Sequence, residues 1–241
     1  MLPNTHWLYT TPIAHRGLHD AALPENSLPA IEAAIAHGYA IEIDIRLTAD
    51  GEIVVFHDHN LPRMTGKQGD IRDFTLDELT TITLLDTDHT IPSLAETLAL
   101  VNAQVPLLIE IKNEYDIGPI ESKLCDMLEN YSGDYVVQSF NRGSLIWLKQ
   151  HQPHIIRGQL YPDFRVWDMP KKQLRRYVKR FLNKESAPHA VAFSHGMLPN
   201  KYLSKLCRKG VCVLGWTARN NDDVDKIRRY CDNVIFDYVR P

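Results

Sequence analysis

The chain has 241 residues, 44% hydrophobic and 24% charged, with a formal net charge of -3. This is ordinary globular composition, and one α/β barrel commonly has about this length, so we expect a single domain over residues 1–241. The charge excludes the strongly basic field typical of nucleic-acid-binding proteins. No apolar run reaches the roughly 18 residues that a membrane span needs. The four cysteines form no CxxC pair and the first residues show no secretory signal, which predicts a cytoplasmic protein.

Short apolar, β-branched runs alternate along the chain with stretches of helical periodicity. The clearest helical stretches are Ser27–His37, Ser93–Asn102 and Ile120–Asn130. The alternation predicts a parallel sheet with helices outside it. Nine runs predict strands: Ile13–His15, Ile41–Ile45, Ile53–Phe56, Leu107–Ile111, Tyr135–Val137, Ile156–Leu160, Ala190–Phe193, Val211–Trp216 and Val234–Phe236.

One of the nine predicted strands is a hairpin return. The segment TADGE between Leu47 and Ile53 is too short for a helical crossover, and Asp-Gly is a strong hairpin signal. Eight parallel strands remain, which predicts an α/β fold of the (β/α)8 TIM-barrel type. If Asp50 and Gly51 are the two turn residues, Asp44 lies opposite His57, and Glu42 shares the face of Asp44.

Charged residues interrupt the predicted strands near their ends. In a (β/α)8 barrel the chemistry lies at the carboxyl ends of the strands, and buried charges must be paired or metal-bound. Glu42, Asp44 and Glu110 are therefore candidate oxygen ligands for one divalent cation, Mg²⁺ or Ca²⁺. The alternative is a structural ion-pair network of these acids with nearby arginines and Lys112.

Other strand-end residues suit a phosphate ester. His15 and His57 are candidates for the catalytic acid and base, and either ring can take either role. Arg16 and Lys112 are candidates for binding phosphate oxygens. Trp216 is either a pocket residue or part of the barrel packing, and its place at a strand end favours the pocket.

Taken together, the motifs resemble those of the glycerophosphodiester phosphodiesterases. The resemblance runs in order from residue 13 to the C-terminus and rests on HRG, PENS, EIDIRLTADGEIVVFHDHNLPRMTG, IPSL, IEIK, QSFN, GWTARN and FDYVRP. It implies a barrel of the phospholipase C-like type, with His15 and His57 as the acid–base pair and Glu42, Asp44 and Glu110 as cation ligands. It also implies hydrolysis of a small-molecule glycerophosphodiester to sn-glycerol 3-phosphate and an alcohol.

Several neighbouring residues have two readings. Asp58 either caps a turn or supports the site, and Glu25 and Asn26 either cap the first long helix or belong to the site. We expect His19 to be a surface or loop histidine and Asp237 to be a loop or capping residue.

Two other functions remain open. The basic stretch Pro170–Lys184 is either an outer barrel helix or a peripheral membrane contact, and the latter would suit lysophospholipase D activity on lysophospholipids. A catalytically silent barrel that serves as a binding protein is the third reading, which the intact pair of histidines disfavours. The sequence leaves the oligomeric state open.

Overall fold

The computed structural model describes residues 2–161, 163, 185–199, 206 and 208–241. Nine strands form one sheet. Eight of them are parallel and close into a barrel in the order β1-β2-β4-β5-β6-β7-β8-β9, with β9 pairing back to β1. The predicted TIM-barrel architecture is confirmed. The parallel strands are β1 (Ile13–Ala14), β2 (Ala40–Leu47), β4 (Leu107–Ile111), β5 (Tyr135–Ser139), β6 (Arg157–Tyr161), β7 (Ala190–Ser194), β8 (Cys212–Ala218) and β9 (Asn233–Phe236).

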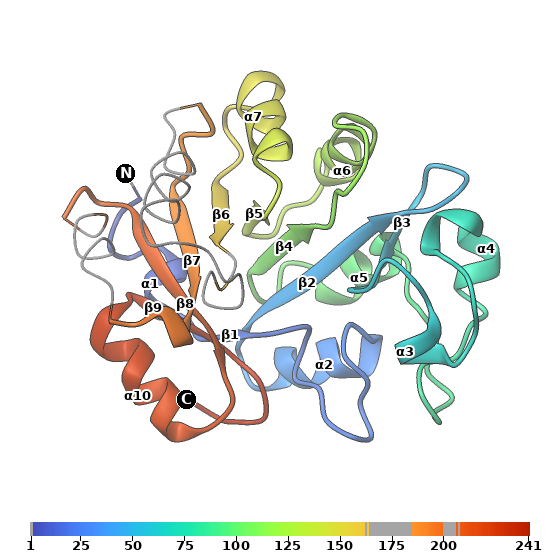
Figure 1. Cartoon of the computed structure of the whole chain (residues 1–241), viewed down its shortest axis with the longest axis horizontal. Coiled ribbons are helices and arrows are strands. Elements are labelled where there is room, and N and C mark those ends of the chain that lie inside the picture. The colour runs from blue at the N-terminus through green and yellow to red at the C-terminus, as the bar shows by residue number, and fades with distance from the viewer. Residues whose placement is uncertain (1, 162, 164–184, 200–205, 207) are drawn as a thin grey trace.

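The helices lie around the outside of the strands (Figure 1). The longer ones are α2 (Leu28–Ala36), α5 (Leu94–Val101), α6 (Pro119–Leu128), α7 (Arg142–His151) and α10 (Asn221–Tyr230). Ser27 and Ser93 cap α2 and α5 by accepting a backbone N–H, as their residue types favour. Short helices complete the described part: α1 (Trp7–Thr10), α3 (Pro62–Thr65), α4 (Leu76–Leu79), and the 3-10 turns η1 (Ile71–Asp73) and η3 (His195–Met197). Within the described residues, no helix is long and apolar enough to cross a membrane.

The hairpin exists, but its predicted register is wrong by one residue. Strand β3 (Ile53–Val55) returns antiparallel to β2, with Ile45 opposite Val55 and Leu47 opposite Ile53. The turn holds three residues, not two, because the Thr48 amide donates to the Glu52 carbonyl at 2.9 Å and Gly51 takes a φ of 79°. Asp44 therefore lies opposite Phe56, whose amide donates to the Asp44 carbonyl at 2.9 Å.

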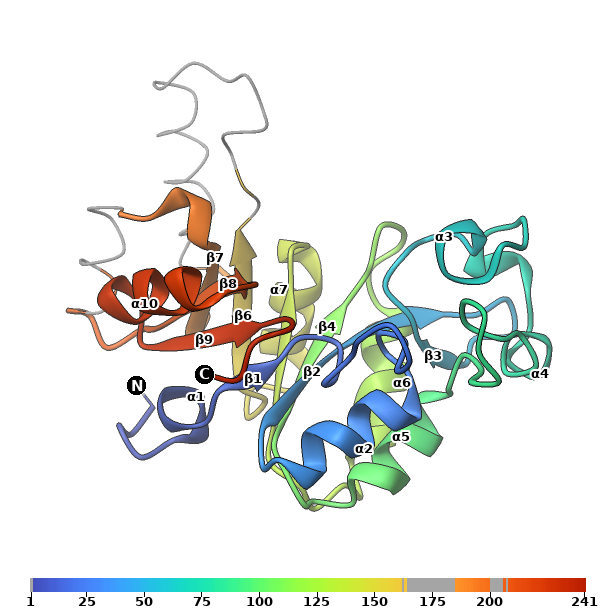
Figure 2. The same ribbon diagram turned by 90° about the horizontal axis from the view of Figure 1, so that it is seen from below.

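Continued along the strand, this register would point the His57 side chain away from the acids. It does not do so, because β3 ends at Val55, before His57. Beyond that point the chain leaves the sheet, and strict alternation of side chains no longer applies. The following segment, with α3 and α4, projects to one side of the barrel (Figure 2). It covers its own apolar cluster, which includes Phe56, Leu61 and Ile71.

Two further apolar clusters fix the barrel. Small and branched side chains such as Leu108, Ala192 and Leu214 fill the interior, and a larger cluster lies between the sheet and its helices. In β2, the isoleucines at 41, 43 and 45 belong to the outer cluster. Because side chains alternate along a strand, Glu42 and Asp44 point inward. The predicted basic segment Pro170–Lys184 lies outside the described residues.

Candidate active site

A cavity of about 190 Å³ opens at the carboxyl ends of the strands. Seven of the eight residues singled out in the sequence line it: His15, Arg16, Glu42, His57, Glu110, Lys112 and Trp216. The eighth, Asp44, is fully buried and contacts the two cations of the cavity. The structure thus brings all eight together from β1, β2, β3, β4, β8 and the loops that follow them.

Three carboxylates form the acidic centre. Ligand atoms of Glu42, Asp44 and Glu110 all lie within 4.8 Å of one another, and each side chain is buried. Asp44 and Glu110 are direct partners across the β2–β4 register, and Glu42 lies two residues before Asp44 on the same face. Buried oxygen atoms at this spacing are able to hold a hard divalent cation.

The ionisation of these acids reflects their crowding. Burial and the neighbouring Asp44 raise the pKa of Glu42 well above its usual range, and burial raises the pKa of Glu110 to about 7. Burial alone would also raise the pKa of Asp44, but Lys112 and Arg16 hold it well below its usual range. Three acids share two cations, so ionisation of all three would leave one negative charge without a counter-charge, and a bound divalent cation would supply it.

Arg16 and Lys112 contact the acidic centre directly. Lys112 Nζ lies 3.1 Å from Asp44 Oδ1 and also pairs with Glu110 Oε1. Arg16 Nε lies 3.2 Å from Asp44 Oδ2, and its backbone amide donates to Glu42 Oε2 at 3.1 Å. The ion-pair network considered as an alternative is thus present in part, although Arg46 pairs with Glu114 instead.

The turn after β1 has a conformation that requires glycine. Arg16 and Gly17 take positive φ values of 56° and 81°. A Cβ atom on Gly17 would lie 2.8 Å from the Ala30 carbonyl carbon, too close for any other residue without rearrangement. This close approach to α2 explains the glycine of the HRG motif and sets the direction of the Arg16 side chain.

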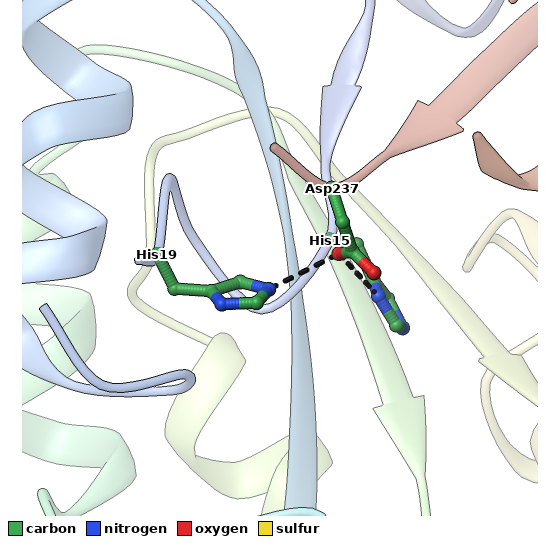
Figure 3. A group of neighbouring side chains, drawn as sticks. All are labelled: His15, His19 and Asp237. Atoms are coloured by element: carbon green, nitrogen blue, oxygen red, sulfur yellow. Dashed lines mark hydrogen bonds and ion pairs between the residues drawn. The ribbon is translucent and has the colours of Figure 1, made fainter. Parts of the chain in front are cut away.

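His15 is held by a residue that sequence reasoning missed. Its Nδ1 lies 2.9 Å from Asp237 Oδ1, and His19 Nε2 lies 3.1 Å from the same oxygen (Figure 3). An ionised carboxylate only accepts, so both imidazoles donate to it, and the Nε2 atom of a neutral His15 carries the free lone pair. That atom lies 4.0 Å from Glu42 Oε2. Burial lowers the pKa of His15, and the hydrogen bond to Asp237 opposes this effect.

His19 and Asp237 both lie in loops, as expected. The sequence did not reveal that the His19 side chain is only 9% exposed, or that Asp237 is buried directly after β9 and contacts both imidazoles. Asp237 lies 222 residues from His15 along the chain, and only barrel closure between β1 and β9 brings them together. Its position at the carboxyl end of the last strand is the signal that could have revealed it.

His57 is held in the same way by its neighbour in sequence. Its Nδ1 lies 2.7 Å from Asp58 Oδ1, so Asp58 supports the site and does not merely cap a turn. Burial lowers the pKa of His57 to about 4, although the charge of Asp44 opposes the shift. Both imidazoles thus have a carboxylate behind Nδ1 and a side chain that lines the cavity.

The Arg63 guanidinium links the loop that carries His57 to the loop that follows β1. Arg63 Nε donates to Asp58 Oδ2 at 2.6 Å, while its Nη1 donates to Glu25 Oε2 at 2.9 Å. Glu25 in turn accepts from Arg16 at 2.6 Å. Asn26 donates to Asp44 Oδ2 at 2.9 Å, so both residues of the Glu25–Asn26 pair belong to the site.

These features define the class of protein. A phosphoric diester hydrolase needs groups that bind the phosphate and groups that transfer protons. The cavity at the carboxyl end of this (β/α)8 barrel has both, as acids and cations around two imidazoles. The family model described as "Glycerophosphoryl diester phosphodiesterase family" matches residues 15–240. The chain belongs to this family, which confirms the predicted family and enzyme class.

Individual relatives agree with this membership. The chain is 32% identical over 246 residues to a protein of Caldanaerobacter subterraneus named glycerophosphodiester phosphodiesterase, covering 95% of this chain and 94% of that protein. A solved glycerophosphodiester phosphodiesterase from Thermotoga maritima superposes with a TM-score of 0.73 at 27% identity, covering 94% of each chain. A phosphodiesterase from Oleispira antarctica, solved in complex with the product sn-glycerol-3-phosphate, superposes with a TM-score of 0.81. At 24% identity, over 95% of this chain and 93% of that one, it supports the fold.

Proposed function

We propose that the chain hydrolyses glycerophosphodiesters to sn-glycerol 3-phosphate and an alcohol, with one divalent cation, Mg²⁺ or Ca²⁺, held by Glu42, Asp44 and Glu110. In this proposal the protein is a single-domain cytoplasmic enzyme that acts on deacylated phospholipids. One observation carries the proposal: two imidazoles, each with a carboxylate at Nδ1, line the same cavity as Glu42, Glu110, Arg16 and Lys112.

The charges of the cavity support a substrate with one negative phosphate. Glu42, Asp44 and Glu110 outnumber Arg16 and Lys112, and Arg219, the third cation of the cavity lining, pairs with Asp237 at 3.5 Å. A phosphate therefore finds no cation in the cavity that lacks a carboxylate partner. A bound divalent cation would reverse this balance and stabilise negative charge that develops on the phosphate oxygens. Arg16 and Lys112, which already contact Asp44 beside that position, would bind the remaining phosphate oxygens.

The two imidazoles divide the proton transfers. His15 and His57 line the cavity with Nδ1 engaged by a carboxylate, which leaves Nε2 to exchange a proton with the substrate. One ring removes a proton from the attacking nucleophile, and the other gives a proton to the departing alkoxide. With water as the nucleophile this step yields sn-glycerol 3-phosphate directly; with the 2-hydroxyl group of the substrate it yields a cyclic phosphate, which water then opens to the same product. Asp237 and Asp58 fix the tautomer and orientation of these rings and act as positioning residues.

Trp216 contributes an apolar wall. Its ring meets Phe140 edge-on, with ring centroids 6.0 Å apart, and both side chains line the cavity. This corner would contact the carbon atoms of the glycerol moiety and exclude water from that side of the phosphate.

The test is the release of sn-glycerol 3-phosphate from glycerophosphocholine, measured with and without a chelator. We expect product without chelator, little product with it, and recovery when Mg²⁺ or Ca²⁺ is added in excess. Absence of product from glycerophosphocholine, glycerophosphoethanolamine and glycerophosphoserine would contradict the proposal. Product formation that is indifferent to chelation would contradict its metal component.

A further inference from the structure

A second, small cavity lies next to the active site. We call it the side cavity; it has a volume of about 20 Å³, and its lining includes Arg46, His59, Arg72, Lys112, Tyr115 and Asp116. A water needs about 10–15 Å³ of such space, so the side cavity admits a small polar group but not a bulky one.

The side cavity adjoins the reacting groups on the side of His57. Lys112 contributes to the lining of both cavities. Arg46 Nε donates to the His57 backbone carbonyl at 2.8 Å, so a second lining residue of the side cavity contacts the backbone of His57. The side cavity therefore borders two residues of the active site.

The charges of its walls favour an anion at one point. Arg46 already pairs with Glu114, and Lys112 already pairs with Asp44 and Glu110. Arg72, by contrast, has no carboxylate within ion-pair distance among the described residues. Its guanidinium carbon lies 4.2 Å from the centre of the Tyr115 ring, an arrangement that holds the cation in place without neutralising it.

The geometry points to the side cavity as a subsite for a carboxylate carried by the leaving alcohol, with Arg72 as the specificity-determining residue. This inference rests on the proposed function and names the preferred substrate class: glycerophosphodiesters of an amino-acid alcohol, with glycerophosphoserine as the probe. An arginine guanidinium can donate two parallel hydrogen bonds to one carboxylate. Asp116 is the only acid among the described lining residues and is available to the ammonium group of the same headgroup.

A matched pair of substrates tests the subsite. Glycerophosphoserine and glycerophosphoethanolamine differ by one carboxylate, so the ratio of their kcat/KM values isolates its contribution. For the wild-type protein we expect a ratio of about 2 to 5 in favour of glycerophosphoserine, the size of effect typical of an ion pair at an accessible site. Arg72→Ala should lower the ratio to about 1. Only the kcat/KM for glycerophosphoserine should fall, because ethanolamine has no carboxylate for Arg72 to bind.

Four further variants test the assignment to Arg72. Tyr115→Phe should keep the ratio and Tyr115→Ala should lower it, because the ring and not the hydroxyl supports Arg72. Arg228→Ala removes an exposed arginine of α10 on the other side of the barrel (Figure 1) and should leave the ratio unchanged. Arg219 lies at the main cavity, so loss of the ratio in Arg219→Ala but not in Arg72→Ala would overturn the assignment.

The outcome separates this inference from the proposed function. If both diesters are cleaved at equal rates and Arg72→Ala changes neither, the subsite is wrong and the phosphodiesterase activity stands. If neither diester is cleaved, the proposed function fails, and the subsite for a leaving alcohol fails with it.

Discussion

Replacing Asp237 with asparagine tests whether Asp237, which barrel closure brings next to His15, positions the His15 imidazole. The substitution keeps the shape of the side chain but removes the charge that accepts hydrogen bonds from His15 at 2.9 Å and His19 at 3.1 Å. Asp237 is only 5% exposed, so solvent screens this charge weakly. A hydrogen bond to a charged group contributes about 1.5–3 kcal/mol. At about 1.4 kcal/mol per tenfold, this predicts a loss of roughly 10- to 150-fold in kcat/KM.

The assay is glycerol 3-phosphate release followed across pH. Burial lowers the pKa of His15 and Asp237 opposes that shift, so removing the charge should lower the pKa further. The limb of the pH–rate profile that belongs to His15 should therefore move to lower pH, which a purely structural defect would not produce. Asp222→Asn, in the exposed first turn of α10, is the matched control. A wild-type rate and an unmoved profile in Asp237→Asn would refute the reasoning.

Four further outcomes are expected. His15→Ala and His57→Ala should each lower kcat by about 10²- to 10⁴-fold with an unchanged circular dichroism spectrum, and wild-type turnover would refute their roles. Removal of divalent cations should lower the melting temperature measured by scanning calorimetry, because the buried acids lose a counter-charge; an equal melting temperature with and without Mg²⁺ or Ca²⁺ would count against the site. Gly17→Ala should destabilise the protein by about 1–3 kcal/mol in urea unfolding because of its φ of 81°, and a neutral effect would contradict the close contact with Ala30. Arg63→Met should lower kcat roughly tenfold with partial rescue by Arg63→Lys, since only a cation bridges Asp58 and Glu25; equal rates in both variants would exclude that bridge.

The hairpin shows that local sequence patterns can predict a chain reversal without predicting its register. The Asp-Gly signal correctly predicts that the chain reverses between β2 and β3, but Ala49 also belongs to the turn and shifts the register by one. Turn length depends on small differences in backbone conformation that residue types alone do not fix. His57 reaches the cavity because the strand ends before it, which the alternation pattern does not reveal.

The sequence by itself determined the strand order of the barrel, its inward-pointing acids and most of the residues around the cavity. It did so because alternation in strands and the position of strand ends are local properties, visible in motifs such as EID and IEIK. Only the tertiary structure decided that Asp237 holds His15 and that Arg63 links Asp58 to Glu25. Asp237 meets His15 because β9 pairs with β1, and Arg63 meets Glu25 because the segment after the hairpin folds back toward the turn after β1. Such contacts join residues far apart in the chain, so no local sequence pattern indicates them.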